Sequence, residues 1–117
     1  GIKNIICSKD SVDLYNPKTI QSSMGSFTRV NIYYEDLDNF FKTSDLKVIG
    51  TSSNTKDNFK KNRSFNGVIL FGNESHGISK SLSNYVDQWL SIKKIGEAES
   101  LNVAVATGII LNQLTND

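Results

Sequence analysis

Apolar residues are grouped along the chain in short segments of two kinds. Where apolar and β-branched residues run together or alternate, the pattern predicts a strand. The predicted strands are Asn4–Cys7, Arg29–Tyr34, Leu46–Gly50, Val68–Phe71 and Trp89–Ile92. Where apolar residues recur at helical spacing, or capping residues bound a segment, a helix is predicted. The predicted helices are Pro17–Met24, Glu35–Lys42, Ile78–Asn84 and Leu101–Leu114.

Strands that alternate with helices predict an α/β fold with a parallel sheet covered on both faces. Ligands of such sheets bind beyond the carboxyl ends of the strands. Three predicted strands end in polar or glycine-rich loops, at Gly50–Thr51, at Gly72–Glu74 and from Ile92 onward. If these strands are neighbours, the three loops form the rim of one pocket. Val68–Phe71 lacks alternation and is therefore expected to be buried on both faces.

Two segments place polar groups at the end of a buried element. Gly72 directly follows a predicted strand, where a glycine would let a ligand approach the backbone closely. Ser100 is expected to cap the last helix, with Asn102 in its first turn, so that free N–H groups face a ligand. Gly108 costs that helix about 1 kcal/mol relative to alanine, which close backbone packing would explain. A tight turn and a capped core helix are the alternative interpretations.

Length, composition, net charge and cysteine count limit the class of protein. A chain of 117 residues is typical of one domain, expected here to span 1–117, and 38% hydrophobic residues suffice for a core. A net charge of +1 neither requires nor excludes a nucleic-acid partner. The single cysteine, Cys7, excludes an intramolecular disulfide and suits a cytoplasmic protein. No apolar segment approaches the length needed to span a membrane.

Several other chemistries are disfavoured. Ser75 and His76 are adjacent and point apart, without the nucleophile elbow of a serine hydrolase. One histidine and one distant cysteine do not make a metal site, so no metal is expected. The absence of a phosphate loop and of a dinucleotide fingerprint weakens the case for an unrelated nucleotide-binding protein.

Basic side chains offer two possible contacts with RNA phosphates. They are Lys56, Lys60, Lys61 and Arg63 in one connection and Lys93 and Lys94 in another. Lys93 and Lys94 lie nearer the predicted pocket rim and are the better RNA-binding candidates. A solvated loop is the favoured interpretation of the first group, and a solvated turn is the alternative for Lys93 and Lys94.

Two segments together resemble the second and third motifs of the SpoU-type RNA ribose 2′-O-methyltransferases, which belong to the knotted SPOUT superfamily. They are Phe71-Gly-Asn-Glu-Ser-His-Gly-Ile-Ser79 and Ile92-(x)₃-Gly96-(x)₂-Glu99-Ser-Leu-Asn-Val-Ala-Val-Ala106. Asp13–Gly25 is also similar to the segment that follows the family's second strand. The resemblance implies a parallel-sheet three-layer sandwich with a C-terminal trefoil knot, an exception to the rule that chains avoid knots. It also implies S-adenosyl-L-methionine as the cofactor, rRNA or tRNA as the partner, and a homodimer.

The resemblance assigns roles to individual residues. The implied cofactor-binding residues are Thr51, Gly72, Ile92 and Leu101, and the implied catalytic residues are Glu74, Ser100 and Asn102. The cofactor would be held largely by backbone groups. Ser100 and Asn102 would orient the ribose, and Glu74 would organise the loop or a basic partner. The reaction would be an in-line transfer of methyl from sulfonium to a ribose 2′-hydroxyl, which positioning can accelerate strongly.

Two departures qualify the resemblance. The family's first motif, an asparagine followed within one helix by an arginine, would precede Gly1, so the chain is expected to lack one N-terminal strand–helix unit. Lys93-Lys94 stands where the family commonly has Pro-Met, which lowers loop stiffness and adds positive charge favourable to RNA. The first departure keeps a second hypothesis open, an RNA- or cofactor-binding module that has lost catalysis.

Overall fold

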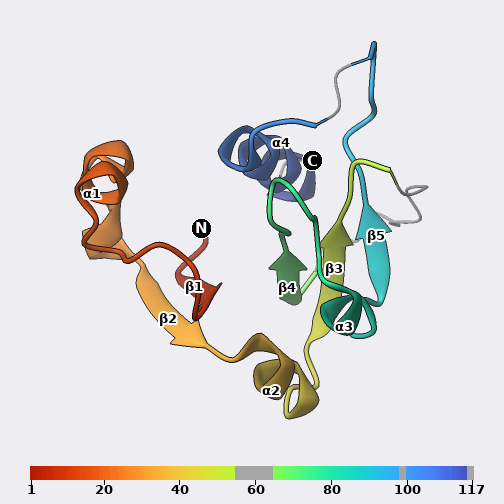
Figure 1. The fold of residues 1–117 in the computed structure, drawn as a ribbon, viewed down its shortest axis with the longest axis horizontal. Coiled ribbons are helices and arrows are strands. Elements are labelled where there is room, and N and C mark those ends of the chain that lie inside the picture. The colour runs from red at the N-terminus through yellow and green to blue at the C-terminus, as the bar shows by residue number, and fades with distance from the viewer. Residues whose placement is uncertain (55–64, 98–99, 116–117) are drawn as a thin grey trace. The chain divides into compact units, whose positions relative to one another are not determined.

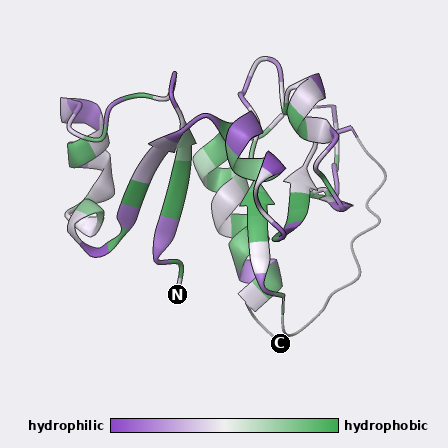
Figure 2. Cartoon of the chain, turned by 90° about the horizontal axis from the view of Figure 1, so that it is seen from below, coloured by the Kyte–Doolittle hydropathy of each residue, from purple (hydrophilic) through white to green (hydrophobic). Residues whose placement is uncertain are grey.

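The computed structural model describes residues 1–54, 65–97 and 100–115. Residue contacts divide the chain into two units, Gly1–Ser44 and Asp45–Asp117, each considered by itself below. The basic residues Lys56, Lys60, Lys61 and Arg63 and the motif residue Glu99 lie outside the described residues. Hydrophobic residues run along the strands, whereas many of the loops are hydrophilic (Figure 2).

The first unit contains a two-stranded parallel sheet formed by β1 (Asn4–Ser8) and β2 (Asn31–Glu35). α1 (Pro17–Ser23) lies in the connection between the two strands, and α2 (Leu37–Lys42) follows β2 (Figure 1). A parallel pair needs such a long crossover, because the chain must return to the starting end of the first strand. The parallel pairing agrees with the α/β prediction.

Local side-chain bonds explain where α1 begins and ends. The Asn16 Oδ1 accepts a hydrogen bond of 3.0 Å from the Lys18 N–H, and Pro17 occupies the first helical position. The helix ends at Met24, which is left-handed with φ of 48°, and Gly25 follows with φ of 81°. The predicted start and end of this helix are therefore confirmed.

Two boundaries of the first unit differ from the prediction. β2 begins later because Ser26–Arg29 forms a 3-10 helix. α2 also begins later because Asp36 caps it, its carboxylate accepting a hydrogen bond of 3.1 Å from the Asn39 N–H. On α2, Phe41 is buried and meets the ring of Phe40 edge-on, with 5.2 Å between ring centroids.

The second unit contains a three-stranded parallel sheet in which β3 (Lys47–Thr51) lies between β4 (Gly67–Leu70) and β5 (Gln88–Leu90). α3 (Lys80–Ser83) connects β4 to β5, and α4 (Val103–Thr115) follows β5 (Figure 1). Every strand pair is parallel, as the alternation of strands and helices predicts.

The most buried strand is β3. Val48 and Ile49 are only 2% and 1% exposed, whereas Leu70, at 7%, is the only buried residue of β4. The prediction that Val68–Phe71 is the strand buried on both faces is therefore wrong. β3 has a hydrogen-bonded neighbour on each side, whereas β4 has one among the described residues, so the side chains of β3 are flanked by both neighbouring strands.

The core of the second unit joins the sheet to α4. Ile49 of β3, Leu90 of β5 and Ile110 of α4 form one buried cluster. The partly buried side chains around it are Phe65, Ile69, Phe71, Ile92 and Leu114. No helix of the described segments is both long and apolar enough to cross a membrane.

Asp87 ties the start of β5 to β3. Its Oδ2 accepts a hydrogen bond of 2.7 Å from the Val48 N–H, and its own N–H donates to the Val48 carbonyl at 2.9 Å. Its Oδ1 lies 3.6 Å from the Lys47 Nζ. These contacts fix the register of the two strands at the end of the sheet opposite to the predicted pocket rim.

Candidate functional site

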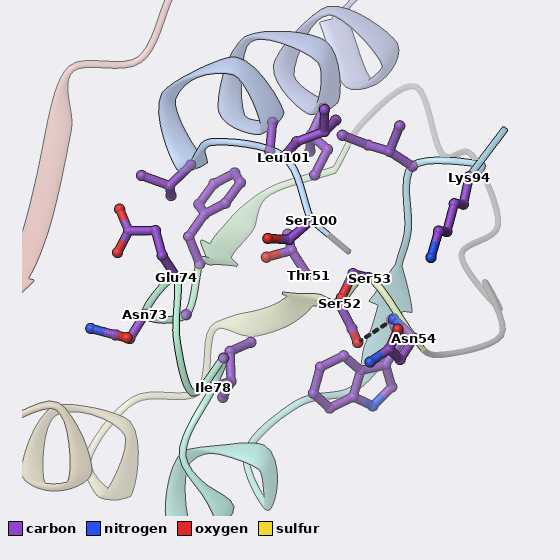
Figure 3. A pocket seen from close by; sticks show the side chains of 18 of the residues that line it. Thr51, Ser52, Ser53, Asn54, Asn73, Glu74, Ile78, Lys94, Ser100 and Leu101 are labelled. Atoms are coloured by element: carbon purple, nitrogen blue, oxygen red, sulfur yellow. Dashed lines mark hydrogen bonds between the residues drawn. The ribbon is translucent and has the colours of Figure 1, made fainter. Parts of the chain in front are cut away.

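A cavity of about 640 Å³ lies beyond the carboxyl ends of β3, β4 and β5. Its walls come from the loops after these strands and from the start of α4 (Figure 3). The lining residues include Thr51–Asn54, Phe71–Ile78, Ile92–Ile95, Ser100, Leu101, Val103 and Ala106. A cavity of this volume suits a small organic ligand. The prediction that three strand ends form one pocket rim is confirmed.

All but one of the predicted site residues line this cavity. They are Thr51, Gly72, Glu74, Ile92, Lys93, Lys94, Ser100 and Leu101. Asn102 is the exception. Glu74 is the one carboxylate among the described lining residues. It lies on the loop after β4, across the view from Lys94 (Figure 3).

The structure adds a second reason for a glycine at position 72, beside the predicted approach of a ligand, which stays a prediction. A Cβ there would stand 2.1 Å from the Gly77 carbonyl carbon and 2.3 Å from the Ile78 nitrogen. The chain's own returning backbone, rather than a ligand, occupies the space that a side chain would need. A substitution intended to block a ligand at Gly72 would therefore displace the loop as well.

Hydrogen bonds hold the loop after β3 between its two neighbours. The Thr51 hydroxyl donates to the Leu70 carbonyl at 3.0 Å, and the Ser52 N–H donates to the Leu90 carbonyl at 3.2 Å. The Ser52 Oγ in turn accepts from the Asn54 N–H at 3.2 Å (Figure 3). Because the Thr51 proton is already donated, its hydroxyl can only accept a hydrogen bond from a ligand.

The cap of α4 is Asn102, so the prediction that Ser100 caps this helix is wrong. The Asn102 Oδ1 accepts hydrogen bonds from the N–H groups of Ala104 (2.9 Å) and Val105 (3.4 Å). The helix therefore begins two residues after the predicted start at Leu101. Ser100 and Leu101 remain in the segment before the helix, where they line the cavity.

Gly108 is also not explained as predicted. A Cβ at this position would meet no described atom within 4 Å, so close packing within the described part of the chain does not require a glycine. Val105, which lies three residues earlier on the same side of α4, is 52% exposed. This part of the helix is thus an open, partly apolar surface.

Main-chain groups at the cavity lack partners. Gly72, Ile92 and Leu101 lie just outside β4, β5 and α4. Their N–H and C=O groups form no hydrogen bond with any other residue of the described segments. Backbone groups are strong donors and acceptors, and removal from water leaves them in need of a partner. A polar ligand that enters the cavity can supply it.

The cavity also contains residues that sequence reasoning did not assign to it. Phe71, Ile78 and Trp89 supply apolar lining, and Ser52–Asn54 supplies hydroxyl and amide groups. Ser52–Asn54 could have been found because it directly follows a strand end. Trp89 also packs near Gly50, where a Cβ would lie 3.0 Å from the Trp89 Cζ3.

Comparison with known protein families agrees with the cavity described above. The sequence pattern of the SpoU rRNA Methylase family matches residues 1–112. The chain belongs to the SpoU family. The resemblance carried by the two motifs is thereby confirmed over nearly the whole chain.

Relatives of this SpoU chain include named 2′-O-methyltransferases. It is 29% identical over 118 residues to the 23S rRNA (guanosine(2553)-2′-O)-methyltransferase of Bacillus subtilis, covering 97% of this chain and 48% of that protein. It is 30% identical over 121 residues to the 23S rRNA (uridine(2479)-2′-O)-methyltransferase of Streptomyces viridochromogenes, covering 95% and 42%. The chain thus spans about half the length of the curated relatives it matches.

Solved structures resemble the SpoU chain in fold. The AdoMet-bound rRNA methyltransferase from Sinorhizobium meliloti matches with a TM-score of 0.83 and 27% identity, over 96% of this chain and 45% of that one. The chain therefore has the α/β fold of known SpoU methyltransferases, with the parallel strands and helices described above.

Proposed function

We propose that this chain carries the S-adenosyl-L-methionine site of an RNA methyltransferase that modifies a ribose 2′-hydroxyl of rRNA or tRNA. One observation carries the proposal: Gly72, Ile92 and Leu101 bring unpaired main-chain groups to one cavity at the strand ends. The names of the relatives, 23S rRNA 2′-O-methyltransferases, and the AdoMet-bound neighbour support the same reaction.

The cavity fits the chemistry of this cofactor. Phe71, Ile78 and Trp89 offer apolar surface for a purine. The Thr51 oxygen, which can only accept, suits the exocyclic amino group of adenine. The negative charge of Glu74 favours a positively charged ligand group, such as a sulfonium or an ammonium. Main-chain groups at Gly72, Ile92 and Leu101 would hold the remaining polar atoms.

The bound cofactor supplies a methyl group on an electrophilic sulfonium. The task of the chain is then to place the ribose oxygen in line with that methyl group and to exclude water. Ser100 and Glu74 both line the cavity, and we assign them to the reacting end of the site. Ser100 would orient the ribose through its hydroxyl, and Glu74 would hold a cationic or hydrogen-bond-donating group.

Asn102 contributes in a different way. Its Oδ1 already caps α4, and Asn102 does not line the cavity. We therefore propose that Asn102 is a positioning residue, which sets the start of α4 so that Ser100 and Leu101 reach the cavity. Direct orientation of the ribose by Asn102, which the family resemblance implies, stays a prediction.

Lys93 and Lys94 are proposed to bind RNA phosphates. Both line the cavity directly after Ile92, so a phosphate bound there would lie beside the proposed cofactor site. Each lysine that neutralises a phosphate releases counterions, so RNA binding should weaken as salt rises.

We also propose the finer features of the family: the three-layer sandwich, the C-terminal trefoil knot, the homodimer and a cytoplasmic location. The open surface on α4 supports the homodimer, because a second copy packed on it would bury Val105 and explain Gly108. Sedimentation velocity over a range of concentrations tests this assembly. A species of monomer mass at every concentration would contradict it.

Trp89 provides the first test, because it is the only tryptophan of the chain and lines the cavity. Titration with S-adenosyl-L-methionine should change its fluorescence and saturate together with a calorimetric isotherm of one ligand per chain. ATP serves as the comparison ligand and should give neither signal. Absence of cofactor binding at millimolar concentration contradicts the proposal.

Two matched variants of α4 locate the ligand. Ala106 lines the cavity, whereas Ala104 is exposed and does not. Ala106→Phe should weaken cofactor binding by at least about tenfold, because the ring occupies space that the ligand needs. Ala104→Phe should bind normally. Equal binding by the two variants would place the cofactor elsewhere.

Methyl transfer requires its own assay. The chain is incubated with radiolabelled cofactor and either rRNA or tRNA, and the digested RNA is separated into nucleosides. A labelled 2′-O-methylnucleoside is the expected product. Cofactor binding without such a product would favour the second hypothesis, a binding module that has lost catalysis.

A further inference from the structure

The loop between β4 and α3 is closed on itself. The Asn73 N–H donates to the Gly77 carbonyl at 3.0 Å, and the Gly77 N–H donates to the Asn73 carbonyl at 2.7 Å. These two bonds form an antiparallel bridge directly beyond Gly72. Gly77 has φ of 67°, a left-handed conformation that favours glycine and lets the chain turn sharply.

The Asn73 side chain forms two hydrogen bonds with this loop. Its Oδ1 accepts hydrogen bonds from the Ser75 N–H at 2.8 Å and the His76 N–H at 3.3 Å. Neither amide donates to a backbone carbonyl of the described residues. Within the backbone bridge, the N–H groups of Ser75 and His76 are thus held by one side-chain oxygen, which is bonded to the loop rather than available to a ligand.

Glu74 is the residue held by these bonds. The residue before it is bridged to Gly77 through its backbone, and the residue after it donates to the Asn73 Oδ1. The backbone of Glu74 is therefore anchored on both sides, although its side chain is exposed. Asn73 and Glu74 lie next to each other on one side of the cavity (Figure 3).

We propose that Asn73 is a positioning residue that acts through Glu74: it holds the loop so that the Glu74 carboxylate is presented to the reacting end of the cavity before any ligand binds. This inference rests on the proposed function. Without the Asn73 oxygen, residues 74–76 would sample other conformations, and the competent fraction would fall. Two lost hydrogen bonds correspond to a decrease of about tenfold or more.

The first experiment needs no turnover. Amide hydrogen exchange of the free chain is followed by NMR for Ser75 and His76 in Asn73→Ala, in Asn73→Asp and in Asn84→Ala. Asn84 is an exposed asparagine outside the loop and controls for the loss of an amide side chain. Exchange should accelerate about tenfold in Asn73→Ala only, because aspartate keeps the acceptor oxygens. Unchanged exchange in Asn73→Ala overturns the inference.

The second experiment tests whether Asn73 acts through Glu74. Methyl transfer is measured for Asn73→Ala, Glu74→Gln and the double variant, with the cofactor dissociation constant measured alongside. Asn73→Ala should slow turnover about tenfold, a larger effect than its effect on cofactor affinity, and Asn73→Asp should restore most of the turnover. In the double variant the two effects should not multiply, because removal of Asn73 costs little once the carboxylate is gone.

The outcomes separate the inference from the proposed function. Independent, fully multiplying effects of Asn73→Ala and Glu74→Gln would assign Asn73 a purely structural role and overturn the inference alone. Normal turnover by Asn73→Ala would do the same. No methyl transfer by the unchanged chain would overturn the proposed function, and the inference with it, whatever the exchange rates of Ser75 and His76.

Discussion

Alanine substitution at two glycines of the second unit should have opposite effects on stability. At Gly72 the new Cβ would stand 2.1 Å from the Gly77 carbonyl carbon, more than 1 Å inside the 3.4 Å at which ordinary contact begins. The obstacle is backbone, which cannot rotate away as a flexible side chain can. At Gly108 the new Cβ would meet nothing within 4 Å.

The expected magnitudes follow from these surroundings. In Gly72→Ala the Gly77 backbone must move away from position 72, which breaks the two hydrogen bonds between Asn73 and Gly77 at about 1 kcal/mol each. Overpacking around the new methyl group costs about 1–3 kcal/mol more. The free energy of unfolding should therefore fall by about 3–5 kcal/mol. Gly108→Ala should raise it by about 1 kcal/mol, since alanine is the better helix former.

Denaturant unfolding followed by the fluorescence of Trp89 measures both effects in one assay. The midpoint should move down for Gly72→Ala and up for Gly108→Ala, with unchanged slopes. An unaltered midpoint for Gly72→Ala would refute this prediction, because it would mean that the loop can move away from the new Cβ without a loss in the free energy of unfolding. If a second copy packs on Gly108, the gain of Gly108→Ala should reverse as the protein concentration rises.

Three further predictions concern charged side chains. Asp87→Ala should lower the free energy of unfolding by about 1–3 kcal/mol, because the buried Val48 N–H loses its acceptor. Urea titration measures this loss. Asp87→Asn keeps an acceptor oxygen and should lower the free energy of unfolding by less. Lys93→Ala and Lys94→Ala should each weaken RNA binding alike across sequences and lower the slope of log affinity against log salt by about 1; a filter-binding series at several salt concentrations decides it. Hydrogen bonds from the Ser8 hydroxyl and from its own backbone lower the pKa of the Asp10 carboxyl in the folded chain. These hydrogen bonds stabilise the fold fully above the unfolded pKa of about 3.9. The stabilisation is lost as pH falls through the lower pKa of the folded state. The stability of Asp10→Asn should therefore vary less with acid pH than that of the unchanged chain, and parallel curves would contradict the assignment.

Sequence reasoning succeeded best where the deciding interactions are local. Asn16 and Pro17 start α1 and Gly25 follows its end because caps and turns involve residues only a few positions apart. The alternation of strands and helices correctly indicated parallel pairing. The two motifs identified the family, since their polar residues have a spacing that few other sites share.

Long-range packing decided what local patterns could not. β3 rather than β4 became the buried centre, because strand order depends on contacts between residues far apart in sequence. Ser100 and Asn102 are equally good capping residues in isolation, and only the path of the chain into α4 made Asn102 the cap. The same holds for Gly72, whose neighbour in space is the returning backbone at Gly77.

The sequence by itself thus determined the approximate elements, their parallel pairing and the family, and all but one of the residues that it predicted for the site line the cavity. The tertiary structure alone decided which groups are free to act there. A hydrogen bond already made within the fold, as at Asn73, Thr51 or Asn102, removes a donor or an acceptor from the chemistry available to a ligand. Residue type and spacing do not show which donors and acceptors are already used, because these hydrogen bonds form only when the chain folds.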